Sequence, residues 1–593
     1  MTRTLMPKAL PRPVDATLGE GWFRTHQRAV LDYYLAVPDD DLLFGFRRRR
    51  GLPASGTELG GWYGGGVYHV FGQILGGLAR LHRATGDLSA RDKSLSLLSG
   101  FERCIEEDGY AFQNRRNEVF DPLYEYEKLL GGLLDVLEIL GFDCSATIRR
   151  ITRWAAANLD RSGSADPTRN DSEKEWHTLS ENLYRAYRLL GDSVFLELAQ
   201  VFEYPYYWNR FLDPSGFSFE TRHAYSHVNN LSGAAMAYRV KGDPRYLEIC
   251  IRAYDEITRN HLYATGGYGP AEKMFGTPGY LGAALLAPLE RSFGHCEIDC
   301  CSHAVFKLSR YLLEATGDAR FADWPERMMY NVLGAQPVPR PDGFLQYYAE
   351  YYRNGGSKRS TDGRLHDDGL TYEWPCCSGT LPQAVAEYSR LLFHASDDTL
   401  HVTQYLPASA DTALVSVEIR TRYPFEDEVE ILVPRLSANL SEIALRVPAW
   451  CREFSAQSGT KTWSALQSER PSDGWLRIPA ASIVEGRIVV RIAQHAEFIP
   501  VDKEHPDLVA LRHGPLVYAA DKVALLVDPS SGILEPRTTD GTLATRPGAV
   551  FRYPRKRIVF RPLMTIPEGE PYYLYMTARL SEADATASGD DAT

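Results

Sequence analysis

The sequence lacks the long apolar runs that would place it in a membrane. No run of about 18 apolar residues occurs, and the start, MTRTLMPKALPRPVDATLGE, has no apolar stretch of the length that a signal peptide needs. These absences exclude a membrane-spanning chain. They predict a cytoplasmic protein without a membrane partner.

The chain also has fewer basic than acidic residues. The 65 Lys and Arg residues are outnumbered by 77 Asp and Glu residues, which gives a net charge of −12. Because binding of a nucleic-acid backbone depends on positive charge, we expect no nucleic-acid partner. With 44% hydrophobic and 24% charged residues, the composition is that of a folded globular protein. A chain of 593 residues is long for one core, so more than one domain is expected.

Cysteines are too unevenly placed for a disulfide framework. The chain has nine, an odd number, and they include the adjacent pairs Cys300–Cys301 and Cys376–Cys377. Adjacent cysteines seldom pair with each other, so a reduced compartment with metal-binding or catalytic thiols fits better. The four isolated cysteines lie in apolar or amphipathic segments, which predicts ordinary core or surface thiols. They are Cys104, Cys144, Cys250 and Cys451.

The pattern of residues 20–397 predicts a series of helices. Apolar residues recur at spacings of three and four, and several segments end at a glycine typical of a helix C-terminus. These glycines are Gly86, Gly141, Gly191, Gly242 and Gly317. The first four are about 50 residues apart, which suits two helices with their loops. We therefore expect helical hairpins repeated around a ring or along a solenoid, and an (α/α) toroid is the preferred architecture.

The interval between the last two glycines is longer than the others, and it contains TGGYGPAE and HCEIDCC. Insertions in repeat folds collect on one face, often the binding face, so we expect the chemistry there. Thr265–Gly269 is a glycine-rich loop that could approach a ligand closely, and Glu272 follows it. A carboxyl group in a partly dry pocket can act as a general acid. The plainer alternative for Glu272 is a solvated loop residue.

Short β-strands are expected from residue 398 onward. Segments such as VEILVPRL, RIVVRIAQHAEFI and LVALRHGPLVYAA alternate apolar and polar residues between turn signals. We expect an all-β sandwich region of jelly-roll type over residues 398–580. Residues 1–19 are an N-terminal extension in this division, and the acidic tail 581–593 is expected to be disordered.

The other five cysteines fall into two groups that could share a metal ion. One group lies in HCEIDCCSH at the predicted start of a helix, and the other lies in EWPCCSGT. Thiolates with a nearby carboxylate suit tetrahedral zinc. Cys300 with Glu297 or Asp299 could meet Cys376 and Cys377 around such an ion.

The spacing of these cysteines in the sequence does not decide their function. A structural zinc, a catalytic zinc and metal-free core cysteines are all compatible with it, because the pattern is not a C-x-x-C pair. His295 and His303 are further candidate ligands, although a histidine in a loop or on a helix surface explains each of them as well.

Together these motifs resemble a known family. TGGYGPAE, CCSGT, CCSHAVFKLSRYLLEATGD, LRVPAW and HGPLVYAAD are similar to segments of the zinc-dependent β-L-arabinofuranosidases of glycoside hydrolase family 127 and its sister family 146. The resemblance extends over about residues 55–525. It implies a multidomain α+β protein, in which an (α/α)6 barrel with the catalytic site precedes β-sandwich domains. It also implies Zn²⁺ as cofactor.

The resemblance assigns roles at the reacting centre. It implies that Glu272 is the acid/base and that Cys376 is the nucleophile, with Cys300, Cys376 and Cys377 as zinc ligands. The family's fourth ligand is a glutamate, and its position holds Ile298 here. Of the two acids that flank Ile298, Glu297 is our preferred replacement and Asp299 is the alternative.

The resemblance also implies a substrate pocket. His223 and His69 match histidines of the family that contact substrate or belong to its G-H-x-x-G-H motif, whose second histidine is Gln73 here. Glu127 occupies the place of another family histidine. His177 matches a further one after a shift of one residue. The polarity of the pocket therefore differs from the family pattern.

The implied function is that of a retaining exo-acting glycofuranosidase, above all a β-L-arabinofuranosidase acting on an oligosaccharide or glycoside. Cys376 would attack the anomeric carbon while Glu272, about 5 Å away, protonates the leaving oxygen. Two alternatives stay open. One is another toroid sugar enzyme, such as a uronide hydrolase, epimerase or lyase, with a structural zinc. The other is an inactive carbohydrate-binding relative. The identity of the furanose and assembly into a homodimer are also open.

Overall fold

The computed structural model describes most of the chain, and all structural statements below refer to these residues. They are 11–64, 70–118, 122–165, 175–213, 222–274, 280–286, 296–341, 345–358, 374–523, 526–527, 551–553 and 558–579. His69, His295 and the acidic tail 581–593 lie outside the described residues.

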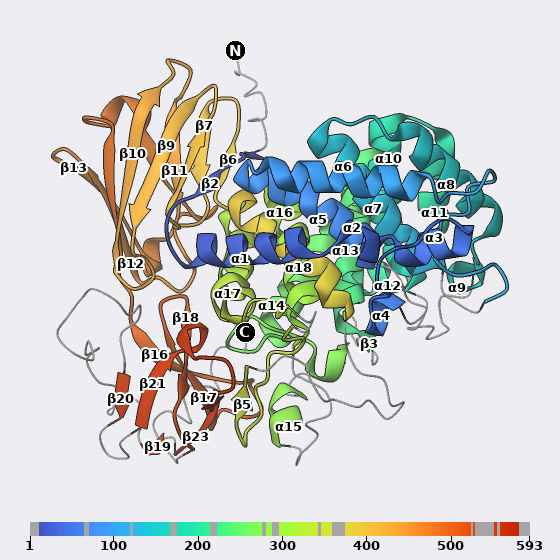
Figure 1. Cartoon of the computed structure of the whole chain (residues 1–593). Coiled ribbons are helices and arrows are strands. Elements are labelled where there is room, and N and C mark those ends of the chain that lie inside the picture. The colour runs from blue at the N-terminus through green and yellow to red at the C-terminus, as the bar shows by residue number, and fades with distance from the viewer. Residues whose placement is uncertain are drawn as a thin grey trace.

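A ring of helices forms the centre of the larger lobe (Figure 1). Each inner helix packs against the next, and the last packs against the first, so the ring is closed. The inner helices are α5 (Val70–Thr85), α7 (Pro122–Leu140), α10 (Ser180–Leu190), α13 (Ala224–Lys241), α16 (Ile298–Thr316) and α18 (Cys376–Arg390). Every described residue of α18 except Arg390 is buried, as expected for a helix enclosed on all sides.

A second layer of helices surrounds this ring. Each outer helix packs on one inner helix, and α1 covers α18. The outer helices are α1 (Trp22–Ala36), α6 (Leu88–Glu102), α8 (Ser145–Asn158), α11 (Ser193–Val201), α14 (Pro244–Asn260) and α17 (Asp323–Asn331). In α14 the buried face includes Ile249, Ala253 and Ile257, whereas α17 is buried on nearly all sides. Two layers of six helices make an (α/α)6 toroid, which confirms the predicted fold class.

The predicted glycine turns connect the two layers. All five glycines lie directly after inner helices and have a positive φ, between 64° and 79°. An aspartate follows the glycine in four of the five turns. Asp87, Asp243 and Asp318 accept a hydrogen bond from a backbone N–H of the next helix. The Gly-Asp dipeptide therefore ends an inner helix and starts the following one. Because every inner helix runs in the same direction, their N-termini gather at one end of the toroid and their C-termini at the other.

Shorter helices fill the connections between the long ones. They are α2 (Asp39–Leu42), α3 (Phe44–Arg50), α4 (Gly61–Gly64), α9 (Ser162–Ala165), α12 (Pro205–Trp208) and α15 (Tyr280–Leu286). Among the described residues, no helix is both long and apolar enough to cross a bilayer.

Two β-sheets form the lobe beside the toroid (Figure 1). One sheet has the order β1 (Arg12–Pro13), β6 (Phe393–Ala395), β7 (Thr399–Val402), β11 (Glu442–Arg446), β14 (Trp475–Pro479). The other has the order β13 (Lys461–Leu466), β12 (Glu453–Ser458), β15 (Arg487–Ile492), β10 (Glu428–Leu436), β9 (Val415–Thr421), β8 (Ala408–Asp411), β2 (Thr17–Leu18). Val415, Val417 and Ile419 of β9 are buried at the period of two that the sequence predicts.

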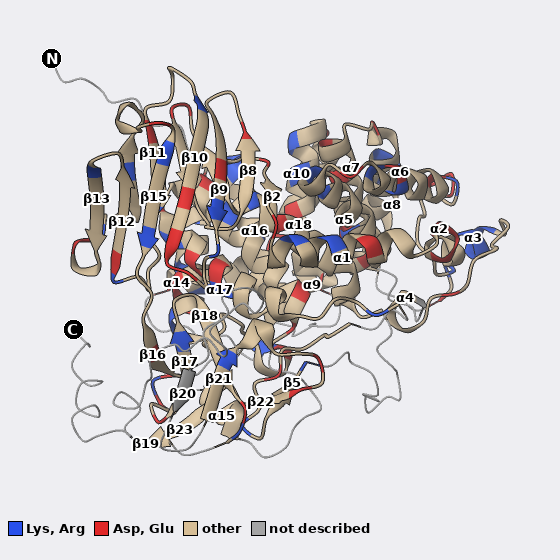
Figure 2. Cartoon of the chain, turned by 60° about the vertical axis from the view of Figure 1, so that its left-hand side comes forward, with Lys and Arg blue, Asp and Glu red and all other residues tan. Residues whose placement is uncertain are grey.

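Basic and acidic residues occur on neighbouring strands of the second sheet (Figure 2). Arg487 of β15 forms an ion pair with Glu430 of β10, at 2.5 Å. Residues 12–18 join this lobe, because β1 pairs with β6 and β2 pairs with β8. The sequence pattern did not predict these two short strands.

The third sheet lies below the first two in Figure 1. Its order is β19 (Leu526–Val527), β23 (Met576–Arg579), β17 (Leu508–His513), β18 (Leu516–Ala520), β21 (Ile558–Pro562), β20 (Phe551–Tyr553), and β16 (Ala496–Pro500) also pairs with β17. Two small ribbons join distant loops. They are β5 (Gly356–Ser357) with β22 (Pro571–Tyr572), and β3 (Arg222–His223) with β4 (Lys273–Met274).

Candidate active site

Two inner helices begin side by side at the centre of the site. α16 begins at Ile298, directly after Glu297, and α18 begins at Cys376, directly after Pro375. One ligand atom from each of Glu297, Cys300, Cys376 and Cys377 lies within 4.8 Å of the others, and all four residues are buried. A helix N-terminus carries a partial positive charge, which favours thiolate and carboxylate groups there.

The contacts within this cluster centre on one carboxylate oxygen. The Cys376 thiol lies 3.0 Å from Oε1 of Glu297, and the Cys377 thiol lies 3.7 Å from the same atom. Cys300 Sγ lies 3.7 Å from Cys376 Sγ and 3.1 Å from Thr380 Oγ1. The four donors therefore surround a common point, as the ligands of one ion would.

The donor set fits a zinc ion. Burial, together with the neighbouring Cys376, raises the pKa of Glu297 well above its usual value. Burial and the neighbouring Cys300 and Cys376 raise the pKa of Cys377 in the same way. Four buried groups that ionise to anions at close range need a cation to hold them in the charged form. Three sulfur donors and one carboxylate match the ligands that zinc takes in proteins.

The two acids that flank Ile298 differ in what their side chains contact. Glu297 points into the cluster, whereas Oδ2 of Asp299 accepts a hydrogen bond from Gln336 Nε2 at 2.9 Å. Cys296, Cys301 and His303 are buried but are not members of the four-donor cluster.

A short strand-like segment positions two tyrosines beside the cluster. Ile298 N donates to Tyr347 O at 3.0 Å, and Ala349 N donates to Cys296 O at 2.8 Å, so residues 345–349 run along the start of α16. The Tyr347 hydroxyl consequently lies 3.4 Å from Cys376 Sγ. The Tyr348 hydroxyl donates a hydrogen bond of 2.6 Å to Glu272 Oε1. The two tyrosines thus lie between the candidate nucleophile and the candidate acid/base.

The Glu272 loop is held close to the site by the β3–β4 ribbon. Strand β3 ends at His223 and pairs with β4, which begins one residue after Glu272. In the preceding glycine loop, Gly269 has a φ of 76° and passes so near Ala224 that an added Cβ would lie 2.3 Å from the Ala224 Cβ. Only glycine fits this position without a rearrangement.

Backbone strain gathers around the same site. Of the five non-glycine residues with positive φ in the described part of the chain, four flank the cluster and the fifth, Glu485, lies in the β lobe. The four are Glu175, Ala271, Glu272 and Trp374, with φ between 41° and 60°. Such conformations cost free energy and are typical of active sites, where the surrounding structure imposes them.

His223 connects the cluster to a second carboxylate. Its Nε2 lies 3.5 Å from Oε2 of Glu297, and its Nδ1 contacts Oε1 of Glu175. Although burial acts in the other direction, Glu175 and Glu297 raise the pKa of His223 well above its usual value. His177 lies nearby, where its Nε2 is 3.2 Å from Ser226 Oγ, and burial lowers its pKa to about 4. His177 is therefore neutral at physiological pH.

Glu127 lies in the interior of the toroid. Its Oε1 accepts a hydrogen bond of 2.6 Å from Asn182, and its Oε2 forms an ion pair of 2.7 Å with Lys128. Gln73 donates to Thr380 Oγ1 at 2.7 Å, and that hydroxyl contacts Cys300. Gln73 therefore supports the cluster from behind. A role for Glu127, His177 or His223 in binding substrate stays a prediction.

Sequence reasoning missed three residues at this site. Glu175 and the two tyrosines, Tyr347 and Tyr348, belong to no motif, and they reach the cluster only because distant segments meet. An acid two residues before His177 and the adjacent tyrosines in LQYYAEYY were the available signals. Neither is specific.

Two solved structures share this architecture over nearly their full length. A GH127 β-arabinofuranosidase matches with a TM-score of 0.71 and 16% identity over 97% of this chain and 99% of its own. A GH127 β-L-arabinofuranosidase from Geobacillus stearothermophilus T6 matches with a TM-score of 0.67 and 16% identity over 95% of this chain and 100% of its own. At this identity the likeness shows the fold alone.

Family models give the narrower assignment. The GH127 catalytic domain of β-L-arabinofuranosidase matches residues 15–390, and the GH127 middle domain matches residues 399–503. The chain belongs to the GH127 β-L-arabinofuranosidase family and is a glycoside hydrolase. Comparison with curated proteins found no match.

Proposed function

We propose that the chain is a retaining exo-acting β-L-arabinofuranosidase with Cys376 as nucleophile and Glu272 as acid/base. The observation that carries this proposal is the cluster itself, in which four donor atoms from two helix N-termini lie within 4.8 Å of one another. Glu297, Cys300, Cys376 and Cys377 would hold the zinc ion. When bound, zinc would keep these thiols deprotonated, because a coordinating thiol loses its proton.

Cys376 provides the atom that reacts with the sugar. Its sulfur lies at the N-terminus of α18 and is 5% exposed, so a substrate can reach it from the site but bulk water is largely excluded. The sulfur attacks the anomeric carbon, and the bond from that carbon to the leaving oxygen breaks. The product of this step is a glycosyl group attached to Cys376.

Glu272 moves the proton in both steps. Its carboxyl group protonates the leaving oxygen in the first step and removes a proton from water in the second, so that the released sugar keeps its configuration. The hydrogen bond from Tyr348 fixes the Oε1 atom, so Oε2 would be the atom that protonates the leaving group. A general acid needs this kind of fixed orientation more than it needs a strong bond.

The experiment compares release of p-nitrophenol from p-nitrophenyl β-L-arabinofuranoside by the wild-type chain and by Cys376→Ser, with zinc and reductant present. We expect one zinc per chain in the wild type and a loss of kcat of about 10³-fold or more in the variant, as for other lost nucleophiles. Cys250→Ser, a buried thiol on outer helix α14, is the matched control and is expected to keep wild-type turnover.

Full turnover by a folded Cys376→Ser chain would remove Cys376 as the nucleophile. Hydrolysis of uronides by a wild-type chain that leaves the arabinofuranoside intact would replace the proposal with a different toroid activity. Retained sugar binding without release from any furanoside would indicate a binding protein.

A further inference from the structure

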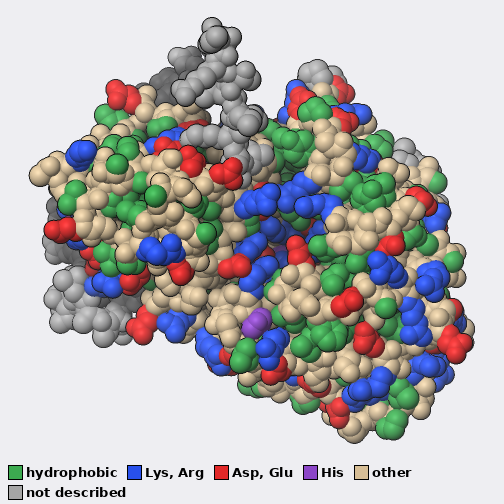
Figure 3. All heavy atoms as spheres, turned by 90° about the horizontal axis from the view of Figure 1, so that it is seen from above, with side chains coloured by type: hydrophobic (Ala, Val, Ile, Leu, Met, Phe, Trp, Pro, Cys, Tyr) green, Lys and Arg blue, Asp and Glu red, His purple; other side chains and the backbone are tan. Residues whose placement is uncertain are grey.

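The end of the toroid opposite the candidate active site contains a second cavity. Its volume is about 140 Å³, and its lining comes from all six inner helices: α5, α7, α10, α13, α16 and α18. The lining residues near helix C-termini include Arg83, Arg188, Arg239 and Arg390. On the face drawn in Figure 3, Lys and Arg side chains gather in a hollow of the surface.

This cavity has more basic than acidic groups, although the whole chain is acidic. The basic residues that line it are Arg80, Arg83, Arg185, Arg188, Arg239, Lys307, Arg310 and Arg390. The acidic residues that line it are Asp135, Glu138, Glu181 and Glu387. Eight cations and four anions leave a surplus of four positive charges, in a chain whose net charge is −12.

The acids of the lining are already used by some of these cations. Arg80 contacts Asp135 at 2.7 Å and Glu387 at 2.9 Å, and Arg185 contacts the same Asp135 at 2.9 Å. Lys307 forms an ion pair with Glu181. Arg83 and Arg390 form no ion pair with an acid of the lining, although both lie within electrostatic reach of Glu387.

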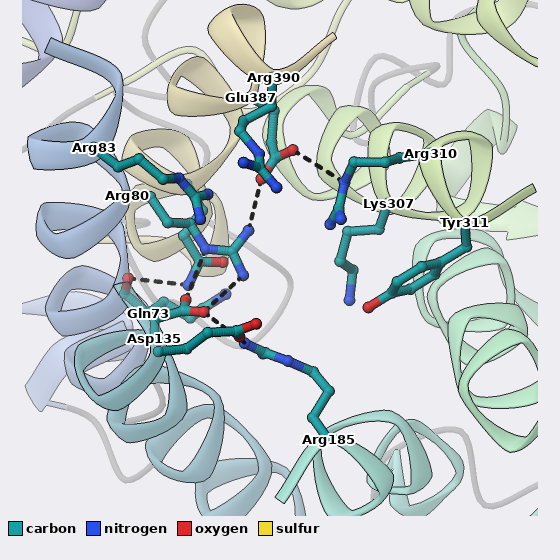
Figure 4. A network of polar contacts seen from close by, with 12 residues as sticks. Gln73, Arg80, Arg83, Asp135, Arg185, Lys307, Arg310, Tyr311, Glu387 and Arg390 are labelled. Carbon is teal, nitrogen blue, oxygen red and sulfur yellow. Dashed lines mark hydrogen bonds and ion pairs between the residues drawn. The ribbon is translucent and has the colours of Figure 1, made fainter. Parts of the chain in front are cut away.

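Arg83 and Arg390 share one carboxylate outside the lining. Asp15, whose side chain is 58% exposed, lies 2.5 Å from Arg390 Nη1 and 3.8 Å from Arg83 Nε. The Nε atoms of both arginines are buried and make no hydrogen bond. Burial and the neighbouring Arg390 lower the pKa of Arg83 to about 10. In Figure 4, the cationic ends of Arg83, Arg390, Arg310 and Lys307 come from three helices and face one central space.

Helix dipoles explain part of this arrangement. The C-termini of the inner helices carry partial negative charge, which favours basic side chains in the last turns. That effect acts on the ends of the helices, and it supplies no acceptor for the buried Nε atoms. It also does not fill the cavity, which has room for several water molecules or for one polyatomic anion.

We propose that this cavity binds a dianionic phosphate group, either as inorganic phosphate or as the phosphate of a small monoester. Arginine matches phosphate because its guanidinium donates several hydrogen bonds in a fixed plane to the phosphate oxygens. Arg83 and Arg390 would donate to it from one side and Arg310 and Lys307 from the other. The site lies apart from the thiol cluster and does not depend on the proposed glycosidase function.

The test is isothermal titration of the full zinc-loaded chain with inorganic phosphate and with glucose 6-phosphate, at constant ionic strength set by chloride. We expect saturable binding of one anion per chain. Arg83→Gln and Arg390→Gln are each expected to raise Kd about tenfold or more, because each removes a charge-assisted hydrogen bond. Arg420→Gln on β9, an exposed arginine paired with Glu418, is the matched control and is expected to leave Kd unchanged.

The two ligands distinguish the source of the phosphate. Tighter binding of glucose 6-phosphate would indicate a monoester, and equal or weaker binding would indicate free phosphate. If Arg83→Gln and Arg390→Gln fail to fold, Arg188→Glu at the exposed edge of the cavity replaces them, and it should also weaken binding. No saturable heat, or binding that Arg188→Glu and Arg83→Gln leave unchanged, would overturn the proposal. In that case these cations serve only the helix C-termini.

Discussion

The two ends of the toroid are built from the same helices and have opposite chemistry. α16 carries Cys300 at its N-terminus and Arg310 three turns further on, and α18 carries Cys376 at its N-terminus and Arg390 at its last residue. One end therefore gathers thiols and carboxylates, and the other gathers guanidinium groups. Parallel inner helices explain the division, because their dipoles favour anions at one end and cations at the other.

Each end of the toroid also has more buried charged groups than the helix dipoles can balance. The thiol cluster has buried anionic donors that fit a cation, and the basic cavity has buried cations that fit an anion. The fold thus makes two sites of opposite sign. Only the anionic end has the proposed nucleophile and acid/base, and among the described residues the strained backbone gathers there.

Substitutions at the two ends of the toroid should differ most in their effect on turnover. Glu272→Gln is expected to lower kcat by about 10²–10⁴-fold, because the leaving oxygen loses its proton donor. The loss should shrink for aryl leaving groups of low pKa, which need little protonation, and a series of such substrates measures this. Glu485→Gln, another glutamate with positive φ but in the β lobe, controls for backbone strain and should be neutral.

At the basic end, Arg188→Gln should leave kcat for the same substrates unchanged, because Arg188 lies at the exposed edge of the other cavity. If it lowered kcat as far as Glu272→Gln does, the assignment of one reacting end would be wrong.

A smaller effect should appear in the pH dependence of stability. His303 of α16 is buried, and burial, with Arg80, Lys307, Lys128 and Arg310, lowers its pKa well below 6.5. In the unfolded chain His303 is protonated below about pH 6.5, whereas in the folded chain it stays neutral. The free energy of unfolding therefore falls as the pH falls below that value. At pH 5 this contribution reaches up to about 2 kcal/mol.

His303→Gln should remove that contribution. Urea unfolding of wild type and variant at pH 7 and pH 5 measures it as the difference between the two pH values within each protein. His82→Gln, at the end of α5, is the control and should keep the wild-type difference. If His303→Gln and wild type lost the same stability between pH 7 and pH 5, the account of a lowered His303 pKa would be wrong.

The helix repeat and the thiol cluster could largely be predicted from local sequence. The glycines after each inner helix mark a conformation that other residues adopt at a cost, so the repeat was visible without a structure. Cys300, Cys376 and Cys377 stand out because adjacent cysteines are unusual. Glu297 was preferred over Asp299 from the sequence, but the pattern itself could not separate them, since a shift of one residue at a helix start changes which side chain points inward.

The basic cavity could not be predicted in this way. Arg83 and Arg390 are far apart in the sequence, and each looks like an ordinary basic residue in the last turn of a helix. The surplus of positive charge arises only in the closed ring, where the acids of the lining form ion pairs with other basic residues. The same reason hid Glu175 and Tyr348, which reach the thiol cluster through tertiary contacts.

The most direct test of the central claim is the identity of the atom that receives the sugar. Glu272→Gln can be loaded with an arabinofuranoside that has a good leaving group, so that glycosylation proceeds while release is slow. Intact mass spectrometry followed by peptide mapping should find one pentosyl group per chain, attached to Cys376. A pentosyl group on a carboxylate instead, or an inverted product without any adduct, would contradict the account.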